Sequence, residues 1–118
     1  NFTLSHGMDT DGGLFDEGHE EGGIAVPNKV WWVQAEAVVG SVNAWQITGD
    51  EKYLDSALKS WAYIKAEIIN GPAGEWFASG KNSPDEKNSH LLCGPWKCPY
   101  HNARAAFEIY ERCEALEK

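Results

Sequence analysis

The sequence predicts an all-α fold with about three main helices and a short β-hairpin arm. Apolar residues recur at helical spacing over residues 29–48, over 50–70 and from about 102 to the end, and glycines and prolines separate these segments. The first segment is apolar almost all round, whereas the second is amphipathic. This alternation is typical of a double-layered ring, in which outer helices cover inner ones.

The length and charge of the chain limit its class. Its 118 residues fit one domain, residues 1–118, and the net charge of −8 argues against binding to nucleic acid or to an anionic membrane. No apolar run is long enough to span a bilayer. Three sparse cysteines indicate reduced thiols and a cytoplasmic protein. The six tryptophans fit either surfaces for stacking sugars or a tryptophan-rich core.

The first predicted helix runs over residues 29–48, with Asn28 as its N-cap and Gly49 as its stop. A set of polar, aromatic and small residues recurs on one face of it. These residues are Trp32, Glu36, Gly40 and Asn43. The face fits the wall of a wet pocket. The alternative is that its polar members only satisfy buried neighbours.

The second predicted helix begins after the N-cap Asp50 and ends at Asn70, with Trp61 in its buried stripe. Residues 74–80 then predict a short strand or hairpin arm. In the third helix, the residues at helical spacing predict a buried stripe. Its members are Ala103, Ala106, Phe107, Tyr110 and Cys113.

His101 is the strongest candidate for chemistry on residue type alone. It lies at the start of the third helix, where the helix dipole favours a neutral imidazole, and a neutral imidazole is a general base. Trp96 precedes it on a proline-bounded turn that could stack a sugar. A capping or core histidine is the alternative. Cys93, Cys98 and His101 lack an obvious fourth ligand, so no metal site is expected.

Four ordered motifs carry a family resemblance. Residues 11–15 read DGGLF, 29–37 read KVWWVQAEA, 74–77 read GEWF, and 94–101 read GPWKCPYH. In this order they resemble the cellobiose 2-epimerases of the N-acylglucosamine 2-epimerase (AGE) superfamily. The resemblance spans most of the chain, and four ordered motifs are far more specific than one.

The resemblance implies an isomerase of carbohydrate metabolism with an (α/α)6 barrel fold, of which this chain would be a single, partial, C-terminal domain. It implies epimerisation at C2 of a reducing-end sugar by two histidines through an enediolate, with no metal or other cofactor. His101 matches one catalytic histidine, and Trp32, Glu36 and Trp96 match substrate-binding residues. Because the other histidine has no match here, we expect the 118-residue chain to be inactive alone.

Two alternatives stay open from the sequence. The substrate could be that of an N-acylglucosamine 2-epimerase or of a mannose isomerase, which belong to the same superfamily. A non-catalytic module is the other alternative. In that case the chain binds a sugar without turning it over, or self-associates through its apolar first helix, which otherwise needs cover from a missing N-terminal portion.

Overall fold

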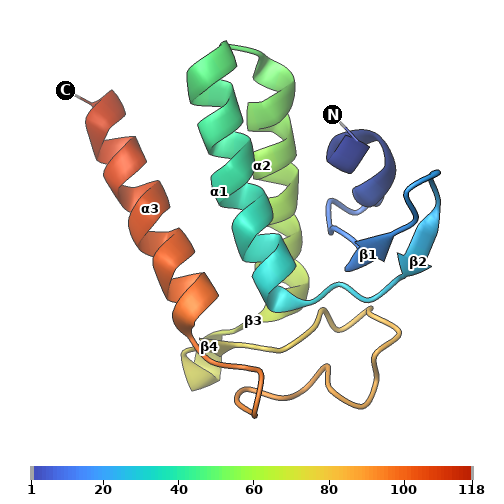
Figure 1. Cartoon of the computed structure of the whole chain (residues 1–118). Helices are drawn as coiled ribbons and strands as arrows, with labels where there is room; N and C mark the ends of the chain where they lie inside the picture. The colour runs from blue at the N-terminus through green and yellow to red at the C-terminus, as the bar shows by residue number, and fades with distance from the viewer. Residues whose placement is uncertain (1, 118) are drawn as a thin grey trace.

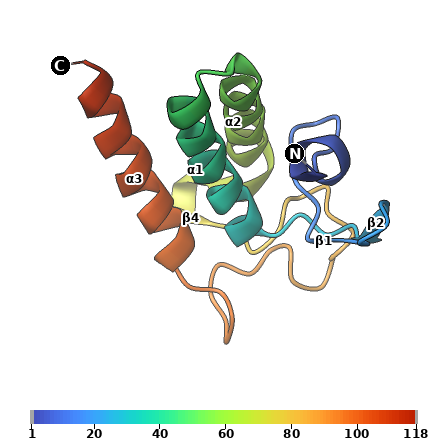
Figure 2. The same ribbon diagram turned by 45° about the horizontal axis from the view of Figure 1, so that its top comes forward.

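Three helices dominate the computed structural model, which describes residues 2–117 (Figure 1). They are α1 (Trp31–Thr48), α2 (Glu51–Tyr63) and α3 (Tyr100–Leu116), and α2 continues as a π-helical turn, η2 (Ile64–Ile68). Figures 1 and 2 both show α1 between α2 and α3. The predicted all-α fold is therefore confirmed. None of the helices within residues 2–117 is both long and apolar enough to cross a bilayer.

The remaining regular elements are short. They are η1 (Thr3–Gly7), β1 (Glu17–Gly18), β2 (Ile24–Val26), β3 (Ile69–Asn70), η3 (Gly71–Ala73) and β4 (Glu75–Trp76). β1 pairs with β2, and β3 pairs antiparallel with β4, so that Ile69 faces Trp76 and Asn70 faces Glu75. The β3–β4 pair confirms the predicted hairpin arm, and it lies below the first turn of α3 in Figure 1.

The ends of α1 match the prediction at one end only. Gly49 adopts φ 70° and donates its backbone N–H to Trp45 O over 2.7 Å, as a C-terminal glycine should. The predicted N-cap Asn28 is wrong, because Val30 occupies that position and offers no side-chain cap. Trp31 N instead donates to Ala78 O over 3.0 Å, so a neighbouring segment satisfies the start of the helix.

The start of α2 confirms the prediction, since the Asp50 side chain accepts a hydrogen bond from Lys52 N. The prediction that Trp61 lies in the core is wrong, because this residue is 40% exposed. The buried residues of α2 are instead Ser56, Ala57, Ser60 and Tyr63. Trp61 follows Ser60 by about 100° around the helix axis, which turns its ring away from the face that they form.

The core divides into two clusters, and both include residues of α1. The larger joins Trp31, Val38, Tyr63, Ile64, Ile68 and Ala78, and the smaller joins Ala35, Val39 and Ala105 of α3. Trp76 and Ile109 pack against both clusters. α1 is therefore the central helix, and α3 reaches the core through only a few side chains.

The buried face of α3 differs from the predicted stripe. Ala105 is its buried residue, and Ile109 packs beside it against α1. The five residues predicted to be buried are all exposed, including Phe107 at 70% and Tyr110 at 62%. The physical reason is that α3 carries apolar residues on two faces, and the pairing of His101 and Arg104 with α1 decides which face turns inward.

Two side chains fasten the N-terminal segment to the helices. Lys29 is 5% exposed, and its Nζ lies 2.7 Å from both Asp9 Oδ2 and Asp11 Oδ2. Gln34 of α1 is fully buried and pairs with both backbone groups of Leu14, accepting from its N over 2.7 Å and donating to its O over 2.8 Å. The segment that precedes β1 is thereby held against α1.

Candidate active site

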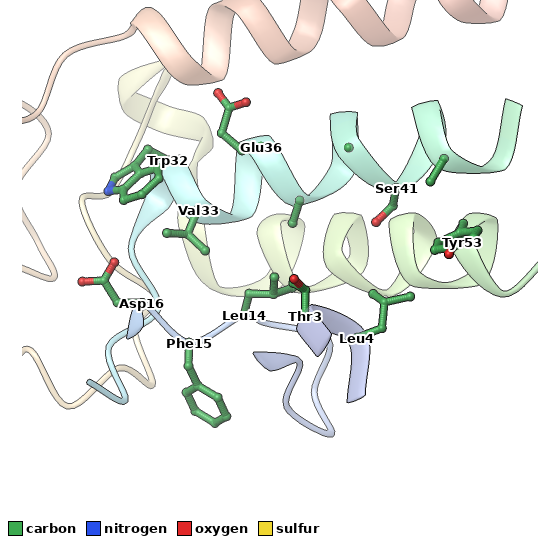
Figure 3. A pocket seen from close by; sticks show the side chains of 13 residues that line it. Thr3, Leu4, Leu14, Phe15, Asp16, Trp32, Val33, Glu36, Ser41 and Tyr53 are labelled. Carbon is green, nitrogen blue, oxygen red and sulfur yellow. The ribbon is translucent and has the colours of Figure 1, made fainter. Parts of the chain in front are cut away.

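The chemically most capable cluster lies where α1 faces the first turn of α3. Glu36 Oε1 lies 2.9 Å from His101 Nδ1, and Glu36 Oε2 accepts a hydrogen bond from Arg104 Nη2. His101 and Arg104 are three residues apart on α3, so they project from the same face of the helix. One carboxylate thus joins both side chains, and Figure 3 shows Glu36 directed toward α3.

Aromatic rings enclose the imidazole from two directions. The ring centroid of Trp32, one helical turn before Glu36, lies 5.8 Å from that of His101 at an interplanar angle of 42°. Tyr100 approaches at 5.1 Å and 81°, with an edge-on geometry. These rings and the Glu36 carboxylate fix the orientation of a side chain that still keeps 33% of its surface exposed.

The charge on Glu36 determines which nitrogen of His101 is available. Burial raises the pKa of Glu36, but hydrogen bonds from Arg104 and His101 outweigh burial and hold that pKa below its ordinary value. The carboxylate is therefore ionised near neutral pH and only accepts hydrogen bonds, so His101 Nδ1 carries a hydrogen. In the neutral ring, Nε2 then keeps a lone pair that can accept a proton.

A groove of about 470 Å³ runs along α1 beside this cluster (Figure 3). Asp16, Trp32 and Glu36 line one end, and Leu4, Ala44 and Tyr53 are among the residues that line the rest. Three members of the face predicted on α1 are thus groove residues, because Gly40 also lines it, whereas Asn43 is not among the lining residues. Burial and the neighbouring Glu17 raise the pKa of Asp16.

The structure brings together three of the four residues predicted from the sequence. His101 contacts both Glu36 and Trp32. Trp96 is 91% exposed on the loop before α3, and within residues 2–117 no ring contact joins it to Trp32 or His101. Cys98 is an exposed free thiol. No group of three or more His, Cys, Asp or Glu with metal-site geometry occurs among the described residues.

Sequence reasoning gave no role to two residues of this site. Arg104 completes the pairing of Glu36, and its spacing of three from His101 was the available signal. Asp16 follows the DGGLF motif and lines the groove because Gln34 fixes Leu14 against α1 and because Asp16 N donates to Asn28 O over 2.8 Å. Nothing in the local sequence around Asp16 indicates that long-range contact.

Comparisons with known proteins agree with this fold. The family model described as N-acylglucosamine 2-epimerase (GlcNAc 2-epimerase) matches residues 1–105. A cellobiose 2-epimerase of Ruminococcus albus is 48% identical over 85 residues, which are 71% of this chain and 22% of that protein. The structure of cellobiose 2-epimerase from Bacillus thermoamylovorans superposes with a TM-score of 0.78 at 40% identity, over 93% of this chain and 28% of that one.

A solved D-mannose isomerase superposes with a TM-score of 0.81 at 26% identity, over 94% of this chain and 28% of that one. The chain belongs to the N-acylglucosamine 2-epimerase family. Its fold is part of the (α/α)6 toroid that the sequence motifs imply. It spans about a quarter of the length of the relatives it matches.

Proposed function

We propose that this chain supplies the C-terminal part of a carbohydrate 2-epimerase of the cellobiose type, with residues 1–118 as one partial domain. The observation that carries the proposal is the Glu36–His101 pair, with its Nδ1–Oε1 distance of 2.9 Å, in which Glu36 also lines the groove together with Trp32. The 48% identity to a cellobiose 2-epimerase supports the substrate class, a small sugar with a free reducing end.

The chemistry follows from the available nitrogen. In the open-chain sugar, the C2 hydrogen lies next to the aldehyde and is acidic. His101 Nε2 takes it as a proton, and the C–H electron pair moves into an enediolate. Glu36 stabilises the imidazolium that forms, because its carboxylate holds Nδ1–H. Trp32 and Trp96 supply apolar faces on which sugar rings stack. The family resemblance implies no metal or cofactor for this step.

One base alone does not complete an epimerisation. The proton must return to C2 on the opposite face, and the resemblance assigns that step to a second histidine from a part of the family fold that this chain does not match. We therefore propose that the 118-residue chain alone does not epimerise cellobiose. Epimerisation of cellobiose by the purified chain would contradict this part of the proposal.

A chimera tests the activity directly. This chain replaces the matching C-terminal segment of the Ruminococcus albus cellobiose 2-epimerase, to which it is 48% identical. In heavy water, we expect the chimera to form the C2 epimer and to incorporate deuterium at C2. His101→Asn should lower kcat by about 10²–10⁴-fold, the usual contribution of a general base.

The matched control is His19→Asn, since His19 is exposed on a turn away from the site. It should leave exchange unchanged. A chimera that folds, as judged by circular dichroism and by elution as a compact species, but shows no exchange would overturn the proposal. Exchange that survives His101→Asn would also overturn the role of His101.

The D-mannose isomerase superposition, with a TM-score of 0.81, favours one second candidate. An aldose–ketose isomerase removes the same C2 proton but returns it to C1. Product analysis of the chimera separates the two activities, because the epimerase gives the 2-epimer and the isomerase gives the ketose. The rest of the chimera comes from a cellobiose 2-epimerase and also influences the product. Mannose is therefore tested as a substrate alongside cellobiose.

A further inference from the structure

A single, partly buried carboxylate holds the chain on both sides of His101. Glu75 Oε1, at the start of β4, accepts from Asn102 Nδ2 over 2.7 Å and lies 3.2 Å from Lys97 Nζ. Its third partner is Trp76 N, over 2.6 Å. Lys97 is four residues before the histidine and Asn102 is the residue after it. One oxygen therefore ties both flanks of the segment that carries the imidazole.

Because Lys97 is buried, its ammonium group needs a partner of opposite charge. Lys97 is only 4% exposed, and its Nζ lies over the Trp31 ring, 5.3 Å from the centroid. The 3.2 Å approach to Glu75 is an ion pair rather than a directed hydrogen bond, since the geometry satisfies only the distance. Glu75 is the carboxylate beside this ammonium, and a buried charge without a partner is strongly destabilising.

The backbone around Lys97 makes the attachment stiff. Gly94 N donates to Lys97 O over 3.1 Å, and Lys97 N donates to Gly94 O over 3.3 Å, which closes a tight loop. Ala103 N donates to Pro99 O over 2.9 Å at the start of α3. Because both ends of the segment are held by hydrogen bonds, a change in the distance between Lys97 and Glu75 should move the imidazole of His101.

We propose that Glu75 and Lys97 are positioning residues for His101. Their ion pair fixes the segment before α3 so that His101 Nδ1 stays within hydrogen-bonding distance of Glu36, which leaves Nε2 as the free nitrogen. The inference rests on the proposed function for its catalytic meaning. Its structural content, the dependence of the His101 tautomer on the Glu75–Lys97 pair, is measured without any turnover.

The test is the tautomer of His101 in the full 118-residue chain, read from the ¹⁵N resonances of its ring at mildly alkaline pH. In the unmodified chain we expect the Nδ1–H form to dominate, because Glu36 accepts from Nδ1. In Glu75→Gln, the share of this form should fall by more than half, toward the Nε2–H form that free imidazole side chains prefer. Glu86→Gln, on an exposed loop, should change nothing.

A double variant guards against simple unfolding. Glu75→Gln with Lys97→Met removes both charges and leaves none unpaired, so the fold should survive. The Nδ1–H share should again fall by more than half. A folded double variant with an unchanged tautomer would overturn the inference and leave the proposed function intact. An inactive chimera with the expected tautomer changes would overturn the proposed function and leave the positioning role intact.

Discussion

Two regions of this molecule use the same arrangement of charges with opposite consequences. In the first, Glu36 binds two cationic or polar partners, His101 and Arg104. In the second, Lys29 binds two carboxylates, Asp9 and Asp11, at 2.7 Å each. Each region centres on one charge shared between two partners, and each joins segments distant in the sequence.

The difference lies in exposure and in what remains free. The Lys29 side chain is 6% exposed and lies 5.2 Å from the centroids of both the Phe15 and the Tyr63 rings. Glu36 is 36% exposed and borders the groove, and its partner His101 keeps a ring nitrogen available. The Lys29 cluster therefore holds the structure together, whereas the Glu36 cluster can take part in chemistry. Substitutions should separate these two roles.

The largest expected effect is on stability and comes from Lys29→Met. It leaves Asp9 and Asp11 without their cation and frees the N-terminal segment. We expect a loss of about 3 kcal/mol in the free energy of unfolding, the lower end for breaking a buried pair, because both carboxylates are about one-third exposed and partly screened by water. Urea denaturation measures it.

The control for this substitution is Lys52→Met. Lys52 also pairs with an aspartate, Asp50, but its side chain is 53% exposed. The urea midpoint should stay where it is. Equal losses in the two variants would mean that burial does not distinguish the Lys29 cluster from an ordinary surface pair.

A second, smaller loss should follow Gln34→Leu. The leucine cannot pair with the two backbone groups of Leu14, so a buried N–H and a buried C=O lose their partners. The expected cost is about 2 kcal/mol. Amide hydrogen exchange at Leu14 should speed up more than at Ala35, which stays in the helix. Gln46→Leu, on the same helix, removes only an exposed hydrogen bond from Arg112, so it should cost much less stability and leave exchange at Leu14 unchanged. Slow exchange at Leu14 in Gln34→Leu would contradict the assigned role.

These long-range contacts mark the limit of what the sequence predicts here. The three helices, the hairpin and the grouping of Trp32 with Glu36 follow from local periodicity and turn residues. The Glu36–His101 contact joins residues 65 positions apart, which no local pattern reveals. The motifs named both residues through family resemblance, but the spacing alone gave no indication of the contact between them.

The failures have a common cause. Phe107 and Trp61 were expected in the core because helical periodicity identifies apolar faces without saying what covers them. Both are exposed in this chain. Lys97 shows the converse: a lysine in a polar loop is ordinarily solvated, and the tertiary approach of Glu75 and of the Trp31 ring explains its burial. Packing between distant segments decided each case.

Stability at acid pH should also distinguish the Lys29 cluster from the Glu36 cluster, with a smaller difference than the substitutions at Lys29 and Gln34 produce. Lys29 lowers the pKa of Asp9, and for Asp11 it helps to outweigh the effect of burial, so both pKa values lie below the ordinary 3.8. The Glu36 pKa lies below its ordinary 4.5. These carboxylates contribute stability that is complete above their unfolded pKa values and is lost as pH falls through the folded ones.

The free energy of unfolding falls as the pH drops below about 4.5, and Glu36→Gln should make this fall smaller. The difference should be less than about 1 kcal/mol, since the Glu36–His101 pair is partly exposed. Lys29→Met should reduce the fall more, because Asp9 and Asp11 then lose their main favourable partner. Urea denaturation across the acid range measures both. A larger effect from Glu36→Gln would reverse the ranking of the two clusters.

The smallest effect on the fold should come from Trp96→Ala, which tests binding in isolation. The Trp96 ring is 91% exposed, so its removal should change the free energy of unfolding by less than about 0.5 kcal/mol. If the ring stacks a sugar, its loss in the chimera should cost about 0.5–1.5 kcal/mol of binding, which raises KM by about 2–10-fold with little change in kcat.

Phe107→Ala, with its ring 70% exposed on α3, is the matched aromatic control and should leave KM unchanged. An unchanged KM in Trp96→Ala would remove Trp96 from the sugar site and leave Trp32 as its aromatic surface, because Trp32 alone among these three rings contacts His101.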